Sequence, residues 1–124
     1  MNFTLREIIH SDFKSFPEEL VPIAYIALGY AQALRDALGV PLVITSGFRS
    51  AGYNSAIGGA KNSHHIWRWE GETPIFALDL TSPSLSAMEL FEKLKPLVRG
   101  ETYLHQKLQF VHISPQAKDE EWIQ

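Results

Sequence analysis

The stretch ITSGFRSAGYNSAIGGAKNSHH, residues 44–65, decides the fold of this chain together with FALDL, residues 76–80. It joins a short β-like run to a Ser-Gly turn with an arginine, a Gly-Gly break and paired histidines, and FALDL places a carboxylate among apolar neighbours. A second piece, FVHIS at residues 110–114, adds a histidine in another β-like run. Catalytic zinc commonly takes three protein ligands from imidazole and carboxylate groups and keeps a fourth position for water. The candidate ligands of this kind are His65, Asp79 and His112.

The composition of the chain narrows the class of protein and the kind of metal site that it can form. The 124 residues, 45% hydrophobic and 20% charged, are typical of a single globular domain spanning 1–124, with a loosely held tail at 116–124. The net charge of −3 argues against a nucleic-acid-binding module. The sequence has no cysteine, so a metal site must use His, Asp or Glu. We expect no membrane insertion and no signal peptide, and therefore synthesis in the cytoplasm.

Hydrophobic periodicity and turn residues predict the elements. The predicted helices cover residues 4–10, 18–38 and 51–57, with a further helix that opens at residue 86 and is distorted near residue 96. The predicted strands cover residues 41–45, 75–80, 101–105 and 108–114. This order favours an α+β fold in which helices pack on one side of a small, mainly antiparallel sheet.

Each candidate residue also has an ordinary structural explanation. A single histidine is most often a satisfied core or surface residue, and a carboxylate such as Asp79 can be a buried cap or an ion-pair partner. Arg49 can be a structural salt-bridge residue. Their conjunction in this order favours zinc binding, but His64 competes with His65 because a sequence does not show which imidazole points inward. His10 is interpreted as a surface residue.

Several of these motifs resemble one known family. SGFRS, NSAIGGAKNSHH, ALD and FVHIS are similar to motifs of the zinc D-Ala-D-Ala carboxypeptidase family, which includes short bacteriophage cell-wall peptidases of the hedgehog/DD-peptidase fold. FTLREIIHSD also resembles the opening of those short members, so the similarity spans roughly residues 3 to 115.

The resemblance implies a function and a role for each matching residue. Zn²⁺ would be held by His65, Asp79 and His112, while Arg49 and Ser63 would bind the substrate. The implied reaction is hydrolysis of a peptide bond in peptidoglycan stem peptides. A monomer with no nucleic-acid partner is expected, and action at the cell wall would follow release of the protein by another agent.

The first departure from the family pattern is an insertion between the first histidine and the aspartate. IWRWEGETPIF, residues 66–76, fills this gap, and Ile75 stands where the family has glycine. Trp67 and Trp69 could form a binding lip or pack over the sheet, and packing is the favoured interpretation.

The second departure concerns the general base. Many members have a glutamate three residues before the last histidine, where this chain has Gln109. In the short phage-type members an acidic residue lies near the end of the preceding strand, and here that position is His105, our predicted base. Glu101, Glu70 and Glu72 are weaker candidates. Two alternatives therefore stay open, a catalytically weakened zinc-binding relative that serves as a wall-binding or phage structural module, and a metal-free domain that keeps only the fold.

Overall fold

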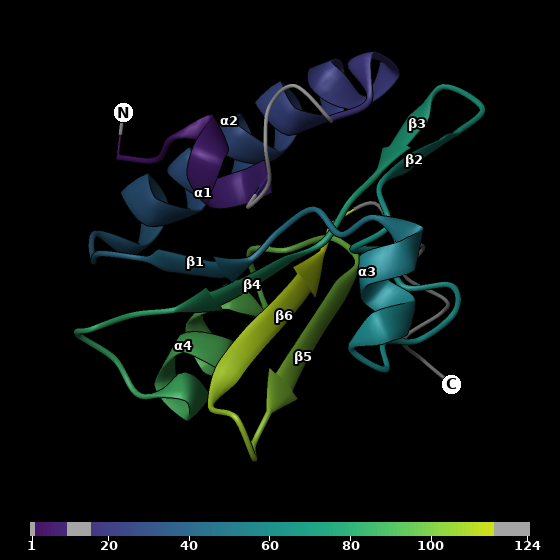
Figure 1. The fold of residues 1–124 in the computed structure, drawn as a ribbon. Coiled ribbons are helices and arrows are strands. Elements are labelled where there is room, and N and C mark those ends of the chain that lie inside the picture. Colours follow the sequence, from purple (N-terminus) through teal and green to yellow (C-terminus); the bar gives the residue numbers. More distant parts are fainter. Residues whose placement is uncertain (1, 10–15, 116–124) are drawn as a thin grey trace.

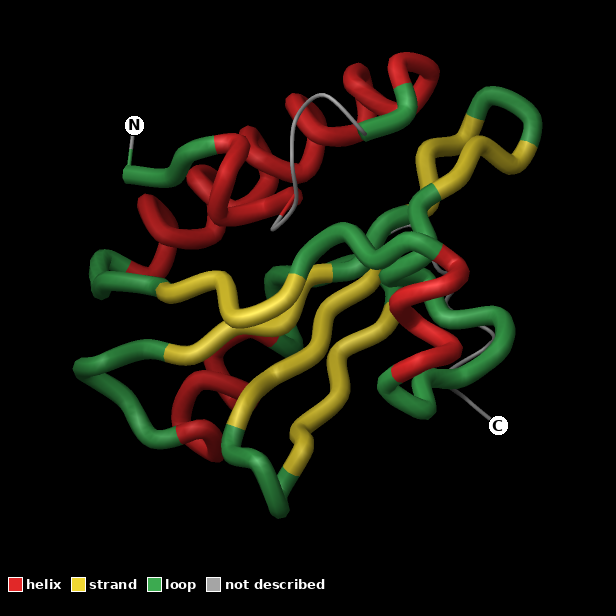
Figure 2. The backbone as a smooth tube through the Cα atoms, in the orientation of Figure 1, coloured by secondary structure: helices red, strands yellow, loops and turns green. Residues whose placement is uncertain are grey.

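The computed structural model describes residues 2–9 and 16–115 (Figures 1 and 2). Its elements, in chain order, are α1 (Leu5–Ile9), the 3-10 helix η2 (Glu18–Leu20), α2 (Val21–Leu38), β1 (Val43–Ser46), α3 (Ala51–Ala56), β2 (Arg68–Glu70), β3 (Thr73–Ile75), β4 (Leu78–Thr81), α4 (Ala87–Leu94), β5 (Glu101–His105) and β6 (Phe110–Ser114). None of the helices in these two ranges is both long enough and apolar enough to cross a membrane. His10 and the tail at 116–124 lie outside the described residues.

The main sheet has the strand order β1-β4-β6-β5, and every neighbouring pair is antiparallel. Leu78 and Leu80 of β4 and Val111 and Ile113 of β6 are fully buried, in one hydrophobic cluster with residues of α2 and α4. Because side chains alternate along a strand, the residues between them lie on the opposite face. The predicted α+β class with a small antiparallel sheet is confirmed.

Two predicted elements are divided in the structure. The predicted strand 75–80 is split, because Ile75 ends β3 while β4 begins at Leu78. Phe76 lies between them, fully buried, and its carbonyl accepts a hydrogen bond from the hydroxyl of Ser114. The predicted helix 18–38 becomes η2 followed by α2, with proline in the first turn of α2, where its missing N–H costs nothing. Gly39 ends α2 in the left-handed conformation, with φ of 68°.

The inserted segment forms the separate hairpin β2–β3 (Figure 1). Trp67, just before β2, is 3% exposed and packs edge-on against Phe16, Phe48 and Phe76. Trp69 is partly exposed, and its indole N–H donates to the carbonyl of Glu19 at 2.9 Å. The structure therefore supports the packing interpretation of this insertion.

Helix α4 begins with the capping box that its sequence predicts. The hydroxyl of Ser86 accepts from the amide of Glu89 at 3.1 Å, and the Glu89 carboxylate accepts from the amide of Ser86 at 3.0 Å. These two bonds satisfy N–H groups that the first helical turn would otherwise leave without partners. The backbone and side-chain hydrogen bonds to Ser86 lower the pKa of Glu89.

We expect Ser86→Ala to lower the free energy of unfolding by about 1 kcal/mol, the usual cost of losing a helix N-cap. Ser86→Asp keeps a capping oxygen and should stay near the wild type. Denaturant titrations of both variants, beside the exposed-site control Ser84→Ala, measure the difference. Equal stability of Ser86→Ala and Ser84→Ala would show that this cap is not needed.

Candidate metal centre

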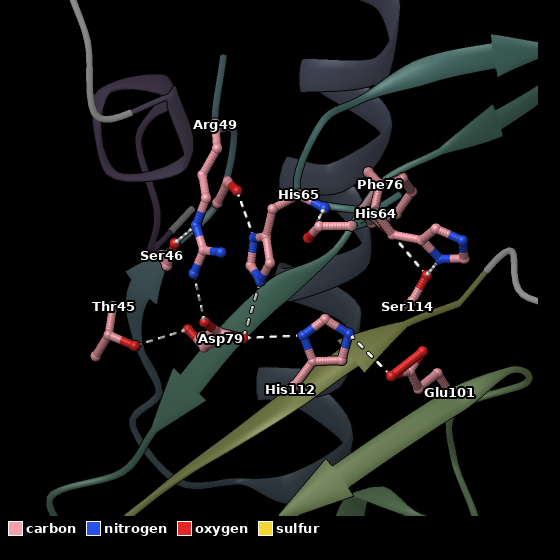
Figure 3. A network of polar contacts seen from close by, with 12 residues as sticks. Thr45, Ser46, Arg49, His64, His65, Phe76, Asp79, Glu101, His112 and Ser114 are labelled. Atoms are coloured by element: carbon pink, nitrogen blue, oxygen red, sulfur yellow. Dashed lines mark hydrogen bonds and ion pairs between the residues drawn. The ribbon is translucent and has the colours of Figure 1, made fainter. Parts of the chain in front are cut away.

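Three side chains from distant parts of the chain meet on the face of the sheet opposite the core (Figure 3). His65 Nε2 and His112 Nδ1 each lie 3.1 Å from Asp79 Oδ1. One ligand atom from each residue lies within 4.8 Å of the other two, the separation expected of atoms that could share one metal ion. These are the three residues that the sequence indicates as candidate metal ligands.

The sheet register explains why Asp79 and His112 meet. They are direct partners in the antiparallel β4–β6 pair, so their side chains emerge on the same face. The apolar neighbours of each residue point the other way, into the core. The alternating pattern of FALDL and FVHIS therefore brings a carboxylate and an imidazole together.

His65 reaches the group from the loop between α3 and β2. Its carbonyl accepts from the amide of Arg49 at 2.7 Å, and its Nδ1 lies 2.7 Å from the carbonyl of Gly47. The amide of Phe48 in turn donates to the carbonyl of Ile8 at 2.8 Å, which joins this segment to α1. His65 is 2% exposed, and these contacts hold it both at its backbone and at Nδ1 of its ring.

Hydrogen-bonding rules indicate which nitrogen of each imidazole faces the centre. A carbonyl only accepts, so we assign the proton of His65 to Nδ1 and a lone pair to Nε2. On His112, Nε2 lies 3.4 Å from Glu101 Oε1, so a proton assigned there leaves the Nδ1 lone pair facing Asp79. Two lone pairs and a carboxylate oxygen then converge, an arrangement that repels itself unless a cation lies between them. This donor set fits a divalent metal such as zinc.

The carboxylate of Asp79 is an anion despite its burial. The residue is 3% exposed, and burial on its own raises the pKa of the carboxyl. In the metal-free protein, hydrogen bonds and charge interactions from His112 and His65 outweigh burial and lower this pKa to about 2. A bound metal ion would take the place of the protons in those hydrogen bonds. At neutral pH the group therefore has the ionised form that binds a cation.

Arg49 forms the positively charged wall of the centre. Its Nη2 lies 3.6 Å from Asp79 Oδ2, and its Nε donates to the hydroxyl of Ser46 at 3.3 Å. Its Nη1 donates to Oδ1 of Asn54 at 3.3 Å. The guanidinium is 18% exposed, so part of it can meet a ligand that enters the cleft.

Asn54 is a residue of the site that the sequence reasoning missed. It is 2% exposed on α3, and its Nδ2 donates to the carbonyl of Ala60 at 2.8 Å. A Cβ at Gly59 would overlap the Asn54 amide group, so glycine is needed where the loop passes it. Asn54 therefore joins the Gly-Gly turn to Arg49. The sequence signal for this role of Asn54 is a polar residue inside a short helix that precedes Gly-Gly.

The structure shows which of the paired histidines faces Asp79. His64 points away from the group, and its Nδ1 is hydrogen-bonded to the buried hydroxyl of Ser114 (Figure 3). That hydroxyl also donates to the carbonyl of Phe76 at 3.1 Å. Ser63 accepts from the amide of His65 at 3.2 Å through its hydroxyl. His65 is thus the histidine of this pair that faces Asp79.

The centre opens into a cleft with a volume of about 620 Å³. The candidate substrate residues Arg49 and Ser63 line it beside the three converging side chains. Its far wall comes from the β5–β6 hairpin and includes Tyr103, Leu108 and His105. The lining of the cleft therefore combines the charged groups of Arg49 and Asp79 with apolar side chains such as Leu108.

The candidate bases differ in whether they line this cleft and in the contacts that they make. His105 lines the cleft, stacks on Phe110 with ring centroids 4.7 Å apart, and accepts at Nδ1 from the amide of Leu108 at 3.1 Å. Gln109 has its side-chain amide hydrogen-bonded within its own turn, to the carbonyl of Gln106 at 2.6 Å. Glu101 lines the cleft next to His112.

The other two carboxylates considered from the sequence, Glu70 and Glu72, belong to the β2–β3 hairpin. Both are exposed, and Glu70 pairs with Arg68 at 3.2 Å. Neither is among the residues that line the cleft, in contrast to His105 and Glu101.

Comparison with known proteins adds a family relationship. A family model described as Peptidase M15 matches residues 1–114, a range that includes the three converging side chains. No curated protein and no solved structure matches the chain.

Proposed function

The chain belongs to the peptidase M15 family, and we propose on that premise that it hydrolyses a peptide bond in peptidoglycan stem peptides, with zinc held by His65, Asp79 and His112. The observation that carries the proposal is the approach of both imidazoles to one buried carboxylate oxygen, each at 3.1 Å. The family supports a zinc metallopeptidase. The wall-peptide substrate, and action at the cell wall after release, are the further steps of this proposal.

The metal and the residues of the cleft have different roles in the proposed hydrolysis. Zinc, when bound, supplies Lewis acidity toward the scissile carbonyl and lowers the pKa of water. The partly exposed guanidinium of Arg49 is suited to bind a carboxylate or carbonyl of the peptide. Ser63, which lines the same cleft, offers a hydroxyl to the substrate backbone. The three ligands and Arg49 are fixed by contacts with the protein, so the site needs little rearrangement to receive a peptide.

Proton transfer is assigned to His105. The amide of Leu108 donates to its Nδ1, so the neutral ring carries its proton on Nε2. In this tautomer the lone pair on Nδ1 is engaged, so His105 can take a proton from water only when the Leu108 contact opens. The imidazolium formed in that step can then give a proton to the leaving amine. His105 lines the cleft. Substitution of His105 therefore tests the proposed proton transfer directly.

We expect the zinc-loaded protein to release D-alanine or cleaved peptides from D-Ala-D-Ala substrates or purified muropeptides, and to lose this activity with a chelator. His105→Ala should lower kcat by about 10²- to 10⁴-fold, the usual contribution of a general acid–base group, at little cost in stability. The control is Lys107→Ala, an exposed position on the same turn. Unchanged hydrolysis in His105→Ala would remove this residue from the mechanism.

A second function is favoured by one observation, the lack of a carboxylate at position 109. Gln109 is neutral and its amide is held within its own turn. If the engaged Nδ1 of His105 also prevents proton transfer, the protein would bind zinc and wall peptide without turnover, as a wall-binding or phage structural module. Binding of muropeptides without cleavage, at saturating zinc, would identify this function.

A further inference from the structure

Glu101 stands beside the candidate metal centre on the strand next to His112. In the β5–β6 pair, Tyr103 is directly opposite His112 and Glu101 is opposite Ser114. Because side chains alternate along a strand, Glu101 and Tyr103 project on the same face as His112. The fold therefore places a second carboxylate next to this imidazole.

The two ring nitrogens of His112 face two different carboxylates (Figure 3). Nδ1 lies 3.1 Å from Asp79 Oδ1, and Nε2 lies 3.4 Å from Glu101 Oε1. The side chains of His112 and Glu101 are 16% and 25% exposed, so solvent only partly screens their interaction. This imidazole is thus held between an inner and an outer carboxylate.

We propose that Glu101 is a positioning residue that holds the proton of His112 on Nε2 and so makes Nδ1 the nitrogen that binds the metal. A neutral imidazole has one N–H, and the other tautomer would direct it toward Asp79 and block the metal position. The carbonyl of Gly47 does the same for His65 through Nδ1, at 2.7 Å. The inference rests on the proposed zinc site and adds the residue that sets the tautomer of its ligand His112.

The experiment measures zinc affinity by competition with a chromogenic chelator, which needs no catalytic activity. Glu101→Ala should weaken the Kd for zinc by about 10- to 100-fold, the usual effect of removing a partner of a metal-binding histidine. Glu101→Gln keeps an oxygen that accepts from Nε2–H and should recover most of the affinity. Glu72→Ala, which removes an exposed carboxylate outside the cleft, should match the wild type.

The nitrogen NMR signals of the His112 ring report the tautomer independently. In the zinc-loaded wild type and Glu101→Gln we expect a protonated Nε2 and a metal-bound Nδ1, whereas in Glu101→Ala we expect faster exchange of the Nε2 proton with solvent.

The inference is overturned if Glu101→Ala binds zinc as tightly as the wild type, or if Glu101→Gln is as weak as Glu101→Ala. In either case tight binding by the wild type leaves the proposed zinc site standing. Failure of the wild type itself to bind zinc overturns the proposed site, and this inference with it.

Discussion

Asp79→Asn is expected to lower the affinity for zinc by more than about 100-fold, because losing even an outer partner of a ligand costs about 10- to 100-fold. The carboxylate oxygen lies 3.1 Å from both candidate histidine ligands and supplies the negative charge of the group. Asparagine keeps the shape but has no charge to balance a divalent ion or Arg49. Peptide hydrolysis, where the wild type shows it, should fall below detection.

Chelator competition measures the zinc Kd of this variant, and circular dichroism verifies that it is folded. Asp36→Asn is the matched control, since Asp36 is exposed on α2 and accepts from Gln32 at 3.0 Å. This control should bind zinc like the wild type. A folded Asp79→Asn protein with wild-type zinc affinity would exclude Asp79 as a ligand.

The second large effect is expected from Gly47→Ala, which should lower the free energy of unfolding by about 3 kcal/mol or more. An added Cβ would overlap the carbonyl oxygen of Ile8 and lie 2.9 Å from its carbonyl carbon. These are backbone atoms, which cannot move away as a flexible side chain could. The shift would also disturb the Gly47 carbonyl that accepts from His65, so zinc affinity should fall along with stability.

Denaturant unfolding in the presence of chelator separates the stability effect from metal binding. The control is Gly29→Ala, an exposed position on α2 with no atom within 4 Å of an added Cβ. Alanine is the better helix former, so this control should gain about 0.5–1 kcal/mol. Gly47→Ala with wild-type stability would contradict the close approach of α1 to this turn.

The sequence was sufficient for the features that follow from local periodicity. The alternation in FALDL and FVHIS predicted two strands, and it places Asp79 and His112 opposite the core. The capping box at Ser86 and the stop at Gly39 were also readable, because each depends on a few adjacent residues.

Other features depend on packing that no local pattern encodes. The strand predicted over 75–80 is interrupted because Phe76 is buried and its carbonyl accepts from Ser114, a residue distant in sequence. The orientation of the paired histidines depends on Ser114 and on the Gly47 carbonyl, which accept from His64 and His65 respectively.

The supporting residues of the site were harder to find than its candidate ligands. The sequence ranks Glu101 below His105 as a candidate base, because the contact of Glu101 with His112 appears only once β5 and β6 are paired in register. Asn54 was missed because its importance comes from two hydrogen bonds, one to Arg49 and one to Ala60. Such residues act through three-dimensional neighbours, so a single sequence identifies them poorly.

The most direct test is the metal content of protein purified without added zinc, followed by X-ray absorption at the zinc edge. We expect about one zinc ion per chain, with imidazole nitrogen and carboxylate oxygen ligands at about 2.0–2.2 Å. The ion should be lost in His65→Ala and in His112→Ala. A wild-type protein that takes up no zinc even when it is supplied, or whose zinc is unaffected by both substitutions, would contradict the proposed centre.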